Sequence, residues 1–314
     1  MALFLSFLMP LRGQQLPIFT QYREYHGYIN PAAVNSDYLL YEYNSALSVS
    51  YRQQWEQVEG SPRNLFVKGE HLFRGPGSFS LLGGFTVIRD EAHPFSFTGT
   101  YLRLAACLAK DPYAGAISLG FNLGFVQYRT ATAGLEVREA GDPGLTSSEQ
   151  ASGQPDIGFG VYYHRQLANG DNIYGGLSVP QFAMQEYAFS DEMGRFAIKQ
   201  RLQCYVLAGY YHYYESGAFL EPSVWVRYLP GLPMSIDLNC RYSFAQQFWA
   251  GAGISSSANA HLEAGYLLGS LDRGRQNLKI GYGFDFGLQE SGNLFGPAHE
   301  INLAWVFDSR KKRF

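Results

Sequence analysis

The sequence has few charges, few cysteines and no long hydrophobic run, and each shortage excludes a class of protein. Only 16% of the 314 residues are charged, and the formal net charge of −3 leaves no broad basic surface for nucleic acid. No segment reaches the roughly eighteen consecutive apolar residues that a membrane-spanning helix needs. Nucleic acid as a partner and a helical membrane protein are therefore both excluded.

The three cysteines, Cys107, Cys204 and Cys240, are odd in number and far apart in the chain. A disulfide framework needs paired cysteines, and a structural zinc site needs closely spaced ligands. We interpret all three as small strand residues, with a bridge between two of them as the alternative in an oxidising compartment. No cofactor and no metal are expected.

Glycine and aromatic residues are abundant, with 35 Gly, 23 Tyr and 23 Phe. This balance favours strands and turns over helices. The length allows either two ordinary domains or one large β domain. A membrane barrel remains compatible with the mean hydropathy of −0.17, because only every second residue of its strands faces lipid.

Alternation of apolar with polar or small residues repeats from residue 44 onward, and Gly, Pro, Asn or Asp closes each run. Residues 113–128 give the clearest run, and residues 234–243 and 278–288 repeat it. Alternation places the two sets on opposite faces of a strand. The runs are longer than the roughly five or six residues of a sandwich strand and match the about 9 to 11 of a tilted spanning strand.

These runs predict an all-β protein, a transmembrane outer-membrane β-barrel of about 14 antiparallel strands over residues 44–309. An even number fits a closed barrel without exposed edges. Every second connection is short, which places it in the periplasm, whereas residues 129–155 and 180–199 form the longest external loops. The runs begin near residues 45, 64, 79, 95, 113, 156, 172, 200, 218, 234, 247, 260, 276 and 298.

The two ends of the chain differ from the barrel region. Residues 1–13 are similar to a signal peptide, with a disordered apolar tail as the alternative. Residues 14–43 lack steady alternation, and we place them as a periplasmic N-terminal segment that folds against or into the barrel mouth or remains a flexible leader. Residues 310–314 form a basic periplasmic tail, with contact to lipid A phosphates as the alternative.

A candidate cluster follows from strand direction and parity. Arg52 and Glu300 lie near the same end of the first and last strands, which become neighbours when the barrel closes, and Asp285 lies on the adjacent strand. We expect an ion-pair cluster in the lumen at this seam, with Trp55 and His299 at its rim. The cluster either holds the seam and fills the lumen, or positions an external loop against a partner.

Other polar-face residues carry both signs of charge, which predicts an occluded lumen with mutual ion pairs and not an open pore. They are Lys68, Glu70, Glu221, Arg227, Arg241, His261, Glu263 and Lys279. No enzyme is expected, because the histidines are scattered over separate runs and none belongs to a catalytic motif. These histidines are His71, His164, His212, His261 and His299.

Several motifs, in their order and spacing along nearly the whole mature chain, resemble the PorP/SprF family of Bacteroidetes. The N-terminal motifs are Phe19-Thr20-Gln21-Tyr22, Asn30-Pro31-Ala32, Tyr51-Arg52-Gln53-Gln54-Trp55 and Gly60-Ser61-Pro62. The C-terminal motifs are Phe248-Trp249-Ala250-Gly251, Ala264-Gly265-Tyr266, Gly281-Tyr282-Gly283-Phe284-Asp285 and His299-Glu300-Ile301-Asn302-Leu303.

The resemblance implies an outer-membrane protein of the type IX secretion system and gliding machinery. Its implied partners are outer-membrane lipid, the translocon, a periplasmic ring or peptidoglycan-binding component, and a secreted surface protein such as an adhesin. Two other functions remain open, a porin or small-solute transporter and an outer-membrane enzyme. Single-channel conductance separates the porin from a secretion-associated anchor.

Overall fold

The computed structural model describes residues 19–55, 58, 60–75, 77–131, 149–190, 195–244, 247–269, 276–288 and 296–309. The expected signal peptide, residues 14–18 of the expected N-terminal segment, and the basic tail lie outside this described part. None of the helices found among the described residues is long and apolar enough to cross a membrane.

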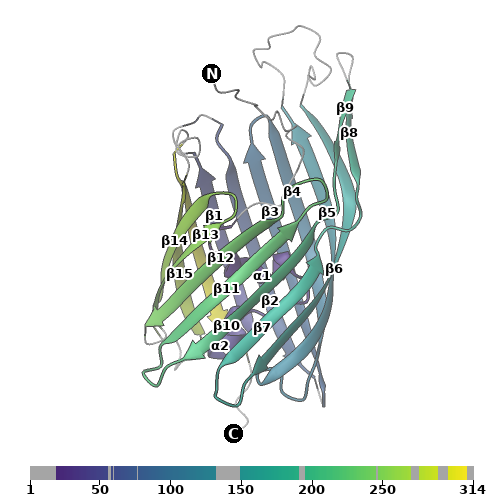
Figure 1. Ribbon diagram of the computed structural model, residues 1–314. Helices are drawn as coiled ribbons and strands as arrows, with labels where there is room; N and C mark the ends of the chain where they lie inside the picture. Colours follow the sequence, from purple (N-terminus) through teal and green to yellow (C-terminus); the bar gives the residue numbers. More distant parts are fainter. Residues whose placement is uncertain are drawn as a thin grey trace.

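A closed antiparallel β-barrel forms the body of the molecule, and it confirms the predicted fold with fourteen barrel strands (Figure 1). The first strand pairs with both the second and the last, so the sheet has no open seam. The strands are β1 (Ser45–Gln54), β2 (Arg63–Arg74), β3 (Phe79–Ala92), β4 (Phe95–Leu108), β5 (Gly115–Thr130), β6 (Gln150–Gln166), β7 (Asn172–Val179), β10 (Cys204–Tyr213), β11 (Phe219–Tyr228), β12 (Ser235–Phe244), β13 (Phe248–Ser255), β14 (Asn259–Leu267), β15 (Gln276–Gly287) and β16 (Ala298–Phe307).

The alternating pattern places apolar side chains outside and polar ones inside. On β5, Leu123 and Phe125 are 53% and 54% exposed on the outer surface, whereas Ser118 and Asn122 are buried in the interior. Such a surface suits hydrocarbon, because lipid replaces water around the outward side chains. We call the end of the barrel with the short turns, such as residues 167–171, the turn end, and the opposite end the loop end.

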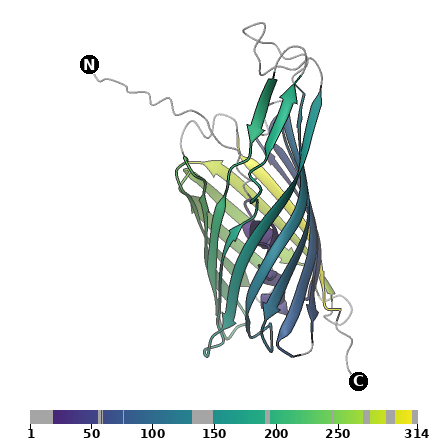
Figure 2. The ribbon, with the colours of Figure 1, turned by 90° about the vertical axis from the view of Figure 1, so that its right-hand side faces the viewer.

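A second small sheet lies within the expected loop 180–199. It is a hairpin of β8 (Glu186–Ser190) and β9 (Arg195–Lys199), and it stands at the loop end beside the extended β6 (Figures 1 and 2). The rings of Tyr187 and Phe189 are buried, and Tyr187 packs 4.5 Å from the ring of Tyr128 on β5. The long connection is therefore partly structured.

Residues 19–43 lie inside the barrel, and we call them the plug (Figure 2). The plug contains η1 (Tyr22–Tyr25), α1 (His26–Ile29) and α2 (Ser36–Tyr41). Its helices are short because Pro31 cannot continue a helix hydrogen-bond ladder and because α2 ends at Glu42, whose φ of 60° is left-handed. The plug begins beside Asp285 near the loop end and reaches β1 at the turn end.

Residues 19–43 therefore lie within the lumen: the expected folding into the barrel describes them, whereas the expected periplasmic position does not. The physical reason is that the segment carries charges opposite in sign to those on the inner face of the barrel. Its Arg23, Glu24 and Asp37 are each almost fully buried, and charged groups remain in such surroundings only when opposite charges meet them. Those opposite charges lie on the barrel wall.

Candidate functional site in the barrel lumen

Arg23 is the centre of the ion-pair network that joins the plug to the wall. Its Nε lies 2.6 Å from Glu221 Oε2 on β11, and its Nη1 lies 2.5 Å from Glu263 Oε1 on β14. Glu221 also pairs with Arg241 at 2.9 Å and accepts a hydrogen bond of 2.7 Å from the Tyr174 hydroxyl. One guanidinium therefore connects separate wall strands through the centre of the lumen.

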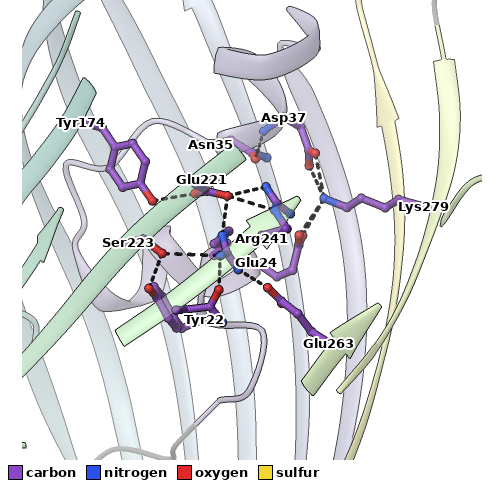
Figure 3. Close-up of polar contacts among 12 residues, drawn as sticks. Tyr22, Glu24, Asn35, Asp37, Tyr174, Glu221, Ser223, Arg241, Glu263 and Lys279 are labelled. Carbon is purple, nitrogen blue, oxygen red and sulfur yellow. Dashed lines mark hydrogen bonds and ion pairs between the residues drawn. The ribbon is translucent and has the colours of Figure 1, made fainter. Parts of the chain in front are cut away.

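Lys279 of β15 holds two parts of the plug at once. Its Nζ lies 2.7 Å from a carboxylate oxygen of Glu24 in η1 and 2.7 Å from one of Asp37 in α2 (Figure 3). The Asn35 side chain caps α2 by accepting a hydrogen bond of 2.8 Å from the Asp37 backbone N–H. The cap orients α2 so that Asp37 meets the lysine.

Glu70 of β2 accepts hydrogen bonds from several donors on a further part of the wall, which β16 and β1 separate from β15. It accepts a hydrogen bond of 2.7 Å from the Asn35 amide of the plug and one of 2.8 Å from Lys68. Arg103 of β4 pairs with Glu70 and also donates a hydrogen bond of 3.0 Å to the Ala33 carbonyl of the plug. The plug is thus bonded to both halves of the barrel.

The structure brings together Arg52, Asp285 and Glu300 at the seam between β1 and β16. Arg52 pairs directly with Glu300 in the strand register, and its Nη2 lies 3.0 Å from Asp285 Oδ2. Arg52 Nε lies 3.8 Å from Glu300 Oε2. Glu300 also accepts hydrogen bonds of 2.9 Å from the Thr20 backbone and 3.1 Å from the Tyr25 hydroxyl. The seam cluster therefore holds the start of the plug as well as the seam.

Trp55 and His299, which were both expected at the rim of the cluster, lie in different places. Trp55 lines a cavity of about 300 Å³ at the loop end, together with Arg52 and Asp285. His299 does not join the cluster, because its neighbour Glu300 points inward and alternate residues of a strand point to opposite faces. It meets the hydroxyl of the outward-facing Tyr282 at 2.6 Å. The placement of His299 at the cluster is therefore corrected.

Glycines on the inner face of the wall make room for the plug. A Cβ at Gly120 would lie 2.6 Å from the Ala32 backbone, and one at Gly283 would lie 2.7 Å from Thr20 Cγ2. A Cβ at Gly160 or Gly176 would collide with the Asn30 side chain. Sequence reasoning identified the motifs of Thr20, of Asn30 and Ala32, and of Gly283, but it missed their contacts with the wall and did not single out Gly120, Gly160 or Gly176. The available signal was the recurrence of glycine at polar-face positions.

The site is built to hold a segment of its own chain. Most of its buried charges belong to opposite-sign pairs, which compensates part of the cost of removing them from water. Among the described residues, no three His, Cys, Asp or Glu side chains form a group that could hold a metal ion. The expected lumen residues Lys68, Glu70, Glu221, Arg241, Glu263 and Lys279 all take part in the plug network.

The fold and the site together define an outer-membrane β-barrel whose described lumen contains a plug. The chain belongs to the PorP/SprF family, because the model of that family, described as type IX secretion system membrane protein PorP/SprF, matches residues 11–305. The family places the protein in the outer membrane and in a secretion complex with other components. No curated protein matches the sequence.

Solved structures share the barrel architecture at low sequence identity. A Pseudomonas aeruginosa FadL homologue has 12% identity and a TM-score of 0.53, with 85% of this chain and 90% of that chain covered. The Pseudomonas putida toluene transporter TodX has 6% identity and a TM-score of 0.52, with 91% and 94% covered. The CymD monoaromatic hydrocarbon channel has 10% identity and a TM-score of 0.53, with 91% and 93% covered. Likeness at this identity shows the fold alone.

Proposed function

We propose that this protein is a non-enzymatic, occluded barrel of the type IX secretion system that anchors a secreted surface protein or assists its secretion. The surface protein is of the gliding or adhesin type, and the barrel also contacts the translocon and periplasmic ring or peptidoglycan-binding components. Family membership supports the secretion role, and the plugged lumen supports the anchor over the channel.

The observation that carries the proposal is the attachment of the plug. Arg23 and Lys279 join it by buried ion pairs to β11, β14 and β15, and Arg103 joins it to β4. Breaking a buried ion pair by removing one partner costs roughly 3 to 5 kcal/mol, so a solute cannot displace the plug cheaply. A secreted protein would therefore cross the membrane through another component, with this barrel at its side.

Conductance in planar bilayers tests the occluded barrel. We expect the folded protein to show no stable open level, whereas a variant that lacks residues 19–41 should conduct if it folds. Heat-modifiable migration on gels verifies folding of both proteins. A wide, stable conductance of the intact chain would favour the porin or small-solute transporter instead.

Site-specific crosslinking tests the anchor. A photoreactive residue at Ala188 or Ala197, both exposed on the hairpin at the loop end, should capture the retained surface protein in cells. The same residue at Leu119, which is 51% exposed on the lipid-facing surface, is the matched control. Equal capture from the hairpin and from the control position would contradict the proposal.

A further inference from the structure

A hollow in the outer face of the barrel lies at the turn end of β4, β5 and β6. Strand register aligns Leu108, Ile117 and Tyr163 in one row across the three strands. Their side chains are 50%, 51% and 39% exposed on the outer surface. This row faces the acyl chains of the bilayer, because it continues the outward apolar face of all three strands.

Two cations and a glycine lie just beyond this row, toward the turns. Gly115 pairs with Arg165 in the register of β5 and β6, and Lys110 follows the end of β4. All three line a hollow of about 470 Å³, which Leu108, Ile117 and Tyr163 also line. Gly115 carries no side chain between the two cations, and a Cβ there would come within 3.0 Å of the His164 carbonyl oxygen on β6.

The charges of this hollow remain available to a ligand. The one carboxylate in its lining, Asp111, pairs with Arg74 at 2.8 Å. In the described part of the chain, no carboxylate forms an ion pair with Lys110 or Arg165. The hollow therefore presents two cations outside any described ion pair, against a single carboxylate that is already paired with Arg74, next to an apolar wall.

Aromatic pairs occupy other parts of the described rim at the turn end. The rings of Phe244 and Phe248 lie tilted to each other with centroids 5.6 Å apart, and Trp305 packs 4.7 Å from Phe307. Such rings form the usual interfacial girdle of a membrane barrel. The pair of cations around Gly115 is a local departure from this girdle.

We infer that this hollow binds a phospholipid with a net negative headgroup from the periplasmic leaflet. The phosphate would lie over Gly115 between Lys110 and Arg165, and the acyl chains would follow Leu108, Ile117 and Tyr163. Short turns face the periplasm in outer-membrane barrels, which places the hollow at the phospholipid leaflet. Lys and Arg near a membrane surface attract anionic lipids.

Native mass spectrometry of the full chain tests this site. The protein is released from nanodiscs of equal phosphatidylglycerol and phosphatidylcholine, and the lipids that remain bound are counted. We expect phosphatidylglycerol to be retained roughly thirtyfold over phosphatidylcholine, as two cations near an anionic headgroup predict. The double variant Lys110→Gln and Arg165→Gln should lose this preference.

The matched control is Arg63→Gln with Arg89→Gln, which removes two exposed arginines at the loop end. This control should keep the preference, and heat-modifiable migration shows that every variant is folded. Three results would overturn the proposal: equal retention of both lipids by the unmodified protein, equal loss in the control, or equally strong competition by lipid A or inorganic phosphate. Lipid A would indicate the wrong leaflet, and phosphate alone would indicate an ion site.

Discussion

Arg23 and Glu221 form an ion pair of 2.6 Å across the lumen, and each side chain is at most 1% exposed. The arginine belongs to the plug and the glutamate to β11. When one member of such a buried pair is removed, water does not take its place. The remaining charge then stays uncompensated in an environment of low dielectric constant. The stability of the barrel is therefore coupled to the presence of the plug.

Arg23→Ala tests this coupling directly. We expect the free energy of unfolding in lipid vesicles to fall by about 3 to 5 kcal/mol, because Glu263 loses its cation and Glu221 keeps only Arg241. Urea unfolding followed by tryptophan fluorescence measures the change. Arg89→Ala is the control, because that side chain is 58% exposed and surface pairs contribute at most about 1 kcal/mol.

The fold could be predicted from sequence, whereas the plug could be predicted only as one alternative and without its contacts, for different physical reasons. In runs such as residues 113–128, apolar residues alternate with polar or small ones. This alternation fixes which face of the strand meets lipid. The neighbours Arg52 and Glu300 also followed from strand direction, since closure sets the register of the first and last strands. The plug has short helices with no sustained period, and no local rule assigns Arg23 to Glu221 on a distant strand. The hairpin β8–β9 was missed because each of its strands has only five residues.

Gly120→Ala should disrupt the packing of the plug against β5 although it adds only one carbon. The new Cβ would lie 2.6 Å from Ala32 Cα, and backbone atoms held by their own contacts cannot move away easily. Overpacking of this kind costs about 1 to 3 kcal/mol. We expect a lower urea midpoint and new conductance. Gly83→Ala is the matched control, because its nearest neighbour is a side-chain atom at 3.6 Å, and it should leave both quantities unchanged.

Arg52→Ala distinguishes the two roles of the seam cluster. Glu300 keeps its hydrogen bonds from Thr20 and Tyr25, so we expect the barrel to stay heat-modifiable. If the cluster positions the loop end for a partner, the variant should release the retained surface protein from cells, which surface immunoblotting measures. Loss of heat-modifiable folding would instead limit Arg52 to holding the seam.

Lys279→Met should lower the free energy of unfolding more than a variant in which Lys279 and both of its carboxylate partners are replaced together. The single change leaves Glu24 and Asp37 buried without the cation that now lies 2.7 Å from each of them. We expect a loss of about 3 to 5 kcal/mol, as for other buried pairs that lose one member.

The triple variant Lys279→Met, Glu24→Gln and Asp37→Asn should recover most of that loss, because neutral groups carry a smaller desolvation penalty. Urea unfolding of the three proteins side by side measures the recovery. A triple variant as unstable as the single one would mean that the lysine acts through packing. In that case the ion pairs would not be what fastens the plug to β15.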